Sequence, residues 1–265
     1  MPINTVDQMR LYVREYGDPT GQTYLCLHGW PNRGTVWQGF AEALGDAFVL
    51  APDFRGYGDS NKPEDGYTCA TFAEDFCSLI AEREVRDFVL VGHSMGGKIA
   101  QLVAARQPEG LKAVVLVCPV PLIATPVPEE KKAAQRQVFT DFREHQESAP
   151  LESLLFGMAA QPLPPTYQNE LRSGAEEASL TAILAWIDVM REEDFSAELP
   201  KIATPALVLH GEKDPLRSES LLREQVADHI TGAKLDILPH VGHLPHLEDR
   251  ETLAKRVQEF VAAVV

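Results

Sequence analysis

The chain has 265 residues, of which 39 are acidic and 24 basic, so its formal net charge is −15 at pH 7. Such an acidic surface repels nucleic acid and anionic membranes, which argues against both as partners. The length suits one large domain with a well-buried core. The first residues lack the basic start and apolar core of a signal peptide, and no apolar run is long enough to span a bilayer. We therefore expect a soluble, cytoplasmic protein.

Short runs rich in apolar residues predict strands along the chain. In order, they fall at 10–17, 23–29, 47–53, 87–94, 111–119, 205–214 and 233–243. The first run alternates apolar and polar residues, as an antiparallel edge strand does, whereas the later runs are continuously apolar. Between the later runs lie amphipathic segments of helix length, at 70–84, 96–107, 218–230 and 248–263. This alternation predicts an α/β fold with a mainly parallel central sheet flanked by helices.

Residues 120–196 break the alternation, because they contain no convincing strand. An unstructured loop of this length is improbable inside a compact domain, so we predict several helices inserted into the core. The predicted division is a core of 1–119 and 197–265 and a helical cap, or lid, of 120–196. Apolar residues of the cap recur at helical spacing, and most should form its own core. The candidates for lining a substrate pocket are Phe139, Phe142, Trp186 and Met190, together with Leu244 outside the cap.

The segment "LVGHSMGGKIAQ", 90–101, places Ser94 between glycines where a predicted strand ends and a predicted helix begins. A G-x-S-x-G match alone is weak, but this strand–turn–helix setting is typical of a nucleophile elbow. There, small neighbours relieve crowding around a strained turn and leave the serine oxygen exposed. The sequence therefore predicts Ser94 as a nucleophile.

A serine hydroxyl needs a base to remove its proton, and the base needs an acid to orient it. In such an architecture the acid follows a late strand and the base follows the last one. Asp214 ends the run "ALVLHGEKD" and is the predicted acid. His243 is the predicted base, because Gly242 before it gives the loop freedom to turn the imidazole toward Ser94. His240 is the reserve candidate.

The three histidines His240, His243 and His246 could instead suggest a metal cluster. Pro239, Gly242 and Pro245 prevent the helix that would gather them on one face, so we predict no metal site. His246, and His93 beside the nucleophile, are interpreted as structural. No organic cofactor is expected either.

Two backbone N–H groups are predicted to form an oxyanion hole. One belongs to Met95, directly after the nucleophile, and the other to Trp30 in the loop "LCLHGWPN". Pro31 has no N–H to offer, and His28 and Gly29 are expected to shape the loop.

Four cysteines, Cys26, Cys69, Cys77 and Cys118, form no C-x-x-C pair and fall mostly in apolar runs. They are interpreted as reduced core residues rather than as a disulfide framework or a metal site.

Together, "LHGWP", "APDFRGYGDSNKP", "GHSMGG", "LHGEKD" and "VGHLPHLE" resemble the α/β-hydrolase superfamily, over nearly the whole chain outside the insert. The resemblance implies an α/β-hydrolase fold with the helical lid inserted after the sixth strand. "HGWP" and "RGYGDSNKP" are also found in epoxide hydrolases and haloalkane dehalogenases, but those use an aspartate where this chain has Ser94. "HGWP" with "GHSMGG" is similar to the cofactor-free haloperoxidases, which are serine esterases with perhydrolase activity.

The resemblance implies a serine-dependent carboxylesterase that cleaves a small to medium, uncharged ester through an acyl-serine intermediate, with perhydrolysis as a side activity. Three alternatives use the same scaffold. One is a C–C bond hydrolase or lactonase with the same triad, and another is a cofactor-free dioxygenase that uses the His/Asp pair. The third is a non-catalytic ligand receptor. The expected partner is a small-molecule substrate, and a homodimer through the lid or an edge strand is compatible with the sequence.

Overall fold

The computed structural model describes residues 9–265. Residues 1–8, which include most of the segment considered for a signal peptide and the start of the predicted core, lie outside the described part.

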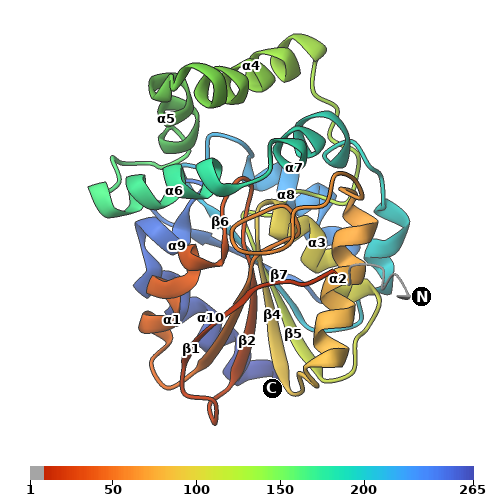
Figure 1. The fold of residues 1–265 in the computed structure, drawn as a ribbon. Coiled ribbons are helices and arrows are strands. Elements are labelled where there is room, and N and C mark those ends of the chain that lie inside the picture. The colour runs from red at the N-terminus through yellow and green to blue at the C-terminus, as the bar shows by residue number, and fades with distance from the viewer. Residues whose placement is uncertain (1–8) are drawn as a thin grey trace, which may run out of the picture.

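A seven-stranded sheet forms the centre of the molecule, in the order β1-β3-β2-β4-β5-β6-β7 (Figure 1). β1 pairs antiparallel with β3, whereas the other neighbouring strands are parallel. This confirms the expected antiparallel edge and mainly parallel sheet. The strands are β1 (Val13–Gly17), β2 (Thr23–Leu27), β3 (Phe48–Pro52), β4 (Phe88–His93), β5 (Leu111–Val117), β6 (Ala206–Gly211) and β7 (Lys234–Leu238).

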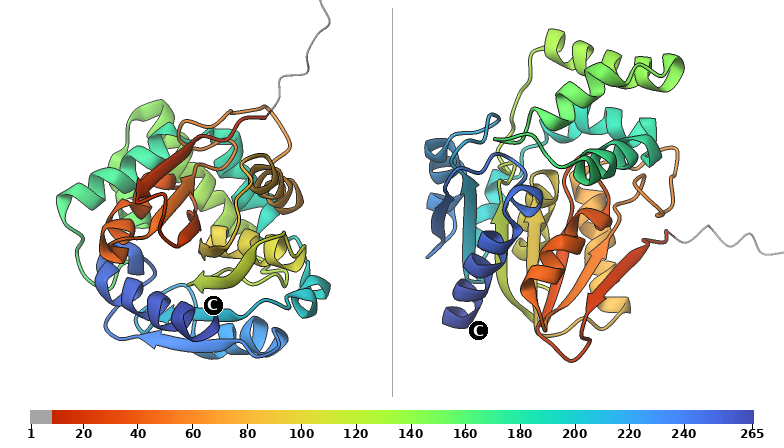
Figure 2. Two further views of the ribbon diagram at one scale, coloured as in Figure 1. Left: turned by 90° about the horizontal axis from the view of Figure 1, so that it is seen from below. Right: turned by 90° about the vertical axis from the view of Figure 1, so that its left-hand side faces the viewer.

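Helices cover both faces of the sheet. One layer contains α1 packed against α10, and Figure 2 shows these two helices side by side across one face. Another contains α2 packed against α3, which contacts β4 and β5. The core helices are α1 (Gln38–Leu44), α2 (Cys69–Glu82), α3 (Met95–Ala105), α8 (Glu219–Gln225), α9 (Pro245–Glu248) and α10 (Arg250–Val264). Every residue of β4 and of β6 is buried, as continuous apolar runs covered on both faces require.

The helical insert follows β5, which is the fifth strand in chain order, and it ends before β6. It contains α4 (Glu129–His145), α5 (Ser148–Phe156), α6 (Pro165–Glu177) and α7 (Leu180–Ala185), and α7 continues into a π-helical turn, Trp186–Met190. A 3-10 turn, Ser196–Lys201, leads back to the sheet. Figure 1 shows these helices stacked at one end of the sheet. The alpha/beta hydrolase fold with a helical insert is thus as predicted, while the division into core and cap domains stays a prediction.

Hydrogen bonds join the insert to loops at the carboxyl ends of strands. The indole Nε1–H of Trp30, after β2, donates to the carbonyl of Ile183 at 3.3 Å. The amide of His243, after β7, donates to the carbonyl of Met158 at 2.8 Å. The insert therefore lies over the carboxyl ends of the strands, where parallel α/β proteins place their ligand-binding sites.

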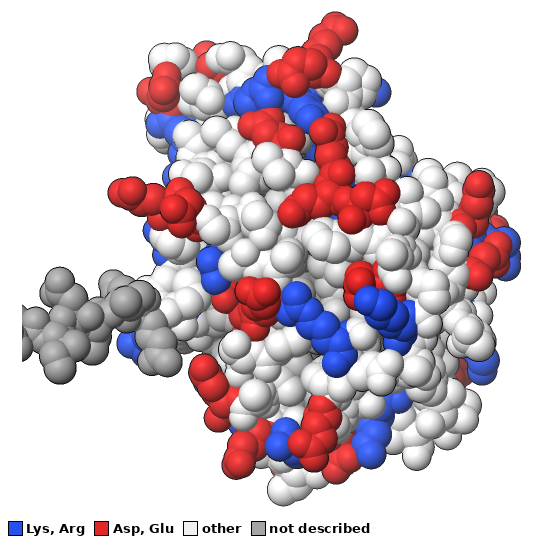
Figure 3. Space-filling model, turned by 90° about the vertical axis from the view of Figure 1, so that its right-hand side faces the viewer, with Lys and Arg blue, Asp and Glu red and all other residues white. Residues whose placement is uncertain are grey.

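Within residues 9–265 no helix is long and apolar enough to cross a membrane. On the face shown in Figure 3, acidic and basic side chains are interspersed rather than separated into patches.

Candidate active site

Ser94 occupies a sharp turn between β4 and α3. Its φ of 51° lies in the left-handed region, which is strained for a residue with a side chain. The turn is fixed on both sides, because the Ser94 amide donates to the Val117 carbonyl at 3.0 Å and the Ser94 carbonyl accepts from Val120 N at 3.0 Å. A Cβ on Gly96 would lie 2.4 Å from the Leu27 carbonyl oxygen, so only glycine fits there. The strand–turn–helix setting expected around Ser94 is present.

Ser94, His243 and Asp214 form a continuous hydrogen-bonded series. The Oγ of Ser94 lies 2.9 Å from Nε2 of His243, and Nδ1 of the same imidazole lies 2.7 Å from Oδ2 of Asp214. Because an ionised carboxylate only accepts hydrogen bonds, Nδ1 carries the proton and Nε2 is free to accept the serine hydroxyl hydrogen. The structure thus brings together the three side chains that the sequence singled out from distant segments.

The carboxylate of Asp214 is buried, with a side-chain exposure of 0%. Burial opposes its ionisation, but hydrogen bonds from His243 and from the amide of Leu216, with the charge interaction with His243, outweigh this and lower its pKa. The carboxylate is therefore charged at neutral pH and suited to stabilise a protonated imidazole.

The loop that carries His243 is held by Glu248. Its Oε2 accepts hydrogen bonds from the amides of Gly242 at 3.0 Å and Ala160 at 2.7 Å, and its Oε1 accepts one from Leu244 at 2.9 Å. A Cβ on Gly242 would lie 2.5 Å from the Ala160 nitrogen. The glycine before His243 is therefore required for close packing against the insert, and its φ is not in the left-handed region.

The loop after β2 runs directly beside Ser94. A Cβ on Gly29 would lie 3.2 Å from Cβ of Ser94, which places the next amide, that of Trp30, beside the nucleophile. Met95 is the first residue of α3, so its amide has no acceptor inside the helix. Within residues 9–265, neither the Trp30 nor the Met95 amide donates a hydrogen bond to another protein group. Both remain available to an oxyanion, the role predicted for them.

His28 fixes the shape of this loop. Its Nε2 accepts from the amide of Phe54 at 3.1 Å, so its Nδ1 carries the proton and donates to the Gly29 carbonyl at 2.9 Å. Burial lowers the pKa of His28 to about 4, so the ring is neutral at neutral pH.

The other histidines lie in different surroundings. His93 donates from Nε2 to the carbonyl of His243 at 2.7 Å and is buried beneath the turn. His246 is buried between the rings of Trp37 and His93, at centroid distances of 5.0 Å and 4.4 Å. The reserve base, His240, is on the surface with 89% of its side chain exposed, beside Glu212. It makes no contact with Ser94.

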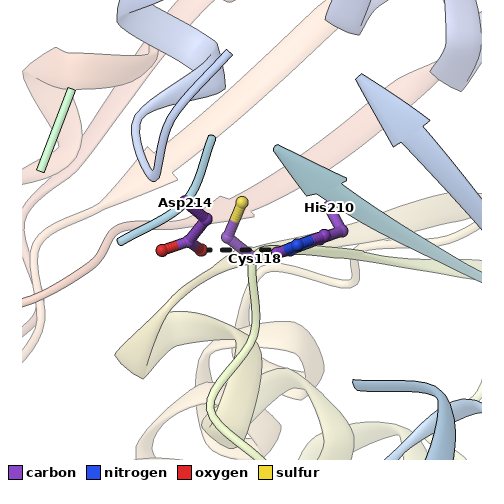
Figure 4. Close-up of side chains that lie close together, drawn as sticks. All are labelled: Cys118, His210 and Asp214. Atoms are coloured by element: carbon purple, nitrogen blue, oxygen red, sulfur yellow. Dashed lines mark ion pairs between the residues drawn. The ribbon is translucent and has the colours of Figure 1, made fainter. Parts of the chain in front are cut away.

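Asp214 also belongs to a compact group of three side chains of types that can ligate metals. Figure 4 shows Cys118, His210 and Asp214, whose ligand atoms lie within 4.8 Å of one another. The Nδ1 of His210 is 4.0 Å from Oδ2 of Asp214. However, that carboxylate already accepts from His243 through Oδ2 and from the amide of Leu216 through Oδ1. A metal bound here would compete with the His243 imidazole for the Asp214 carboxylate. Cys118 and His210 are therefore better explained as the surroundings of Asp214 than as metal ligands.

The apolar residues suggested for a substrate pocket are all buried. Phe139, Met190 and Leu244 have 0% exposure, while Phe142 and Trp186 retain 5% and 4%. Phe139 packs edge-on against the indole of Trp30, at a centroid distance of 5.0 Å, so it reaches the loop after β2 that carries Trp30. Their role in lining a pocket stays a prediction.

Three polar residues at the site escaped the sequence analysis: His210, Arg217 and Glu248. The motif "VGHLPHLE" contained Glu248, but only its contacts with the two sides of the His243 loop indicate its role. For His210 and Arg217, proximity along the chain to Asp214 was the one available signal.

Comparisons with known proteins point to one family. A family model described as "Alpha/beta hydrolase family" matches residues 24–256. A non-heme chloroperoxidase of Kitasatospora aureofaciens is 28% identical, with 92% of each chain covered. A bifunctional esterase/perhydrolase of Acinetobacter calcoaceticus is 26% identical, with 98% of each chain covered. Among solved structures, an esterase from Exiguobacterium antarcticum superposes with a TM-score of 0.86 at 24% identity, with 97% of each chain covered, which shows a shared fold.

Proposed function

Because this chain belongs to the alpha/beta hydrolase family, we propose that it is a serine-dependent carboxylic ester hydrolase whose catalytic residues are Ser94, His243 and Asp214. The hydrogen-bonded series from Ser94 Oγ through the imidazole to the buried carboxylate carries this proposal. These are the distances at which a base can take a hydroxyl proton and an acid can orient that base.

In the proposed reaction, Nε2 of His243 removes the hydroxyl proton as Ser94 Oγ attacks the ester carbonyl carbon. The carbonyl oxygen becomes an oxyanion and accepts hydrogen bonds from the amides of Trp30 and Met95. The imidazolium, stabilised by Asp214, then gives its proton to the leaving alcohol as the ester C–O bond breaks. A water molecule, deprotonated by His243, attacks the acyl-serine and releases the acid.

The substrate we propose is a small to medium ester. The insert packs closely around the oxyanion loop and the His243 loop, through contacts such as Trp30–Phe139 and the His243–Met158 hydrogen bond, which supports a limited acyl size. Perhydrolysis is a proposed side activity, in which hydrogen peroxide replaces water as the attacker of the acyl-serine. The similarity to an esterase/perhydrolase and to a non-heme chloroperoxidase supports it. The sequence favoured an uncharged ester, but Arg217, whose loop folds onto Asp214 and whose buried Nη1 is unpaired in the described part of the chain, favours an anionic one.

The test is turnover of p-nitrophenyl esters with acyl chains of two to eight carbons by the purified protein and by Ser94→Ala. The proposal expects saturable hydrolysis that favours the shorter chains and that falls to the rate of the blank in the variant. Turnover that survives in Ser94→Ala would contradict a serine nucleophile.

A further inference from the structure

Arg217 lies three residues after Asp214, in the loop between β6 and α8. The loop folds back on the acid, since the amide of Leu216 donates to Oδ1 of Asp214 at 2.8 Å. Leu216 points to solvent, with 52% of the residue exposed, whereas Nη1 of its neighbour Arg217 is fully buried. The two side chains therefore leave the loop in opposite directions, and the guanidinium of Arg217 points into the protein.

Arg217 is half-buried as a residue, and the buried end of its guanidinium is unpaired in the part of the chain that the structure describes. Nη1 of Arg217 has no hydrogen-bond partner among residues 9–265. Two other half-buried arginines are neutralised by carboxylates: Arg14 pairs with Asp53 and Arg55 with Asp75, each at 2.6 Å. Within the described chain, no carboxylate comes that close to Arg217. A buried donor without a partner is costly, and a ligand that supplied an acceptor would remove that cost.

The guanidinium is close enough to act on the catalytic groups. Its charge helps to lower the pKa of Asp214 and also that of His93, the residue before the nucleophile, whose pKa is lowered chiefly by burial. Burial is also the main cause that lowers the pKa of Arg217 itself. These directions agree with the position that the loop geometry gives Arg217, beside Asp214 and with Nη1 buried.

A second arginine approaches from the insert. Nε of Arg191 is buried without a partner in the described residues, although its Nη2 donates to Gln135 and to the Ile187 carbonyl. Burial, followed by the charge of Arg217, lowers the pKa of Arg191. The two cations, one from the core and one from the insert, are thus close enough for the charge of one to affect the other.

We propose that Arg217 binds a carboxylate carried by the ester substrate, on its acyl or its alcohol part, while Ser94 attacks the ester group. The inference rests on the proposed ester hydrolase function. A guanidinium offers paired N–H donors that match the two oxygens of a carboxylate. The net charge of −15 disfavours anions at long range, but salt screens exposed charges more than buried ones. The preferred substrate is therefore anionic, in contrast to the uncharged ester that the sequence favoured.

Two substrate pairs test the proposal. The first pair, mono-p-nitrophenyl glutarate and p-nitrophenyl pentanoate, differs by a carboxylate on the acyl part. The second pair, 4-acetoxybenzoate and 4-methylphenyl acetate, differs by a carboxylate on the alcohol part. For each pair the ratio of kcat/KM, charged over neutral, is measured in the wild type and in Arg217→Gln. We expect the ratio to fall at least tenfold in the variant for one pair, partly restored in Arg217→Lys. Arg223→Gln, on the surface of α8 beside Glu219, is the matched control and should keep the wild-type ratio.

An unchanged ratio in Arg217→Gln for both pairs would overturn the proposal. If that variant does not fold, the proposal is tested by inhibition of p-nitrophenyl pentanoate hydrolysis in the wild type. Competitive inhibition by glutarate but not by glutaramide supports an anion site, and equal or absent inhibition contradicts it. If esters are hydrolysed in a reaction that needs Ser94, but the charged-over-neutral ratio does not depend on Arg217, only this inference fails. If no ester is hydrolysed and Ser94 reacts with no phosphonate probe, the proposed function itself fails.

Discussion

Gly29 lies so close to Ser94 that a Cβ added to the glycine would be 3.2 Å from Cβ of the serine and 2.6 Å from Nδ1 of His93. The loop that is proposed to supply one oxyanion donor is thereby set against the nucleophile by backbone packing. The residue after Gly29 is Trp30, whose amide is the proposed donor, and a side chain at position 29 would push that amide away.

Gly29→Ala should therefore lower kcat for ester hydrolysis by about 100-fold, the usual cost of losing one oxyanion donor, with a smaller change in KM. Steady-state kinetics with a p-nitrophenyl ester measure both. Gly39→Ala is the control, because its new Cβ would meet only the flexible side chains of Arg250 and Tyr167. Equal kinetics in the two variants would argue against an oxyanion role for this loop.

Glu248→Gln should lower kcat about tenfold while KM changes little, because an amide cannot accept the three hydrogen bonds that hold the His243 loop and residue 160. The free energy of unfolding should fall by about 1–3 kcal/mol, since buried donors lose their acceptor. Urea denaturation and kinetics measure the two effects. Glu251→Gln, at an exposed position in the next helix, is the control. A loss of stability with an unchanged kcat would make Glu248 purely structural.

Asp214→Asn should reduce kcat by about 10³–10⁴-fold, because an amide that donates to Nδ1 holds the imidazole in the wrong tautomer and cannot stabilise its charge. Folding should be retained, as judged by circular dichroism, because the asparagine oxygen can still accept from the amide of Leu216. A variant with more than a tenth of wild-type kcat would show that another group supports His243.

Buried histidines predict how stability depends on pH. Burial lowers the pKa of His246 from 6.5 to about 3, and neither ring nitrogen has a partner within residues 9–265. Between about pH 3 and pH 6.5, His246 binds a proton in the unfolded chain but not in the folded one. Its effect on the free energy of unfolding is therefore absent above pH 6.5, and stability is lost as the pH falls below that value. From pH 6.5 to pH 5, His246 alone should remove about 1–2 kcal/mol from the free energy of unfolding.

His246→Leu should abolish that part of the loss, so the free energy of unfolding should fall about 1–2 kcal/mol less between pH 6.5 and pH 5 than in the wild type. Urea titrations at the two pH values measure it. His240→Leu, at an exposed position, is the control and should follow the wild-type curve. Parallel curves for wild type and His246→Leu would contradict the assignment.

The sequence was informative where local pattern decides structure. The continuous apolar run before Ser94 becomes the wholly buried β4, and the alternating first run becomes the antiparallel edge strand β1. Helix ends were less predictable. The segment 218–230 is helical only to Gln225, because Val226 has φ −131° and ψ −66° and the chain continues as a 3-10 turn.

Tertiary contacts account for what the sequence could not reveal. Arg217 stands in "DPLRSES", which resembles an ordinary polar loop, and the direction of its side chain follows only from the folding of that loop onto Asp214. The prediction that Gly242 provides backbone freedom was wrong in its reason, since the structure requires the residue for lack of space beside Ala160.

The most direct test of the central claim, an activated Ser94, is the intact mass of the purified protein after incubation with a fluorophosphonate probe. We predict one covalent adduct per chain, absent from Ser94→Ala and formed much more slowly in Asp214→Asn. Folded wild-type protein that acquires no adduct, or an adduct that persists in Ser94→Ala, would contradict it.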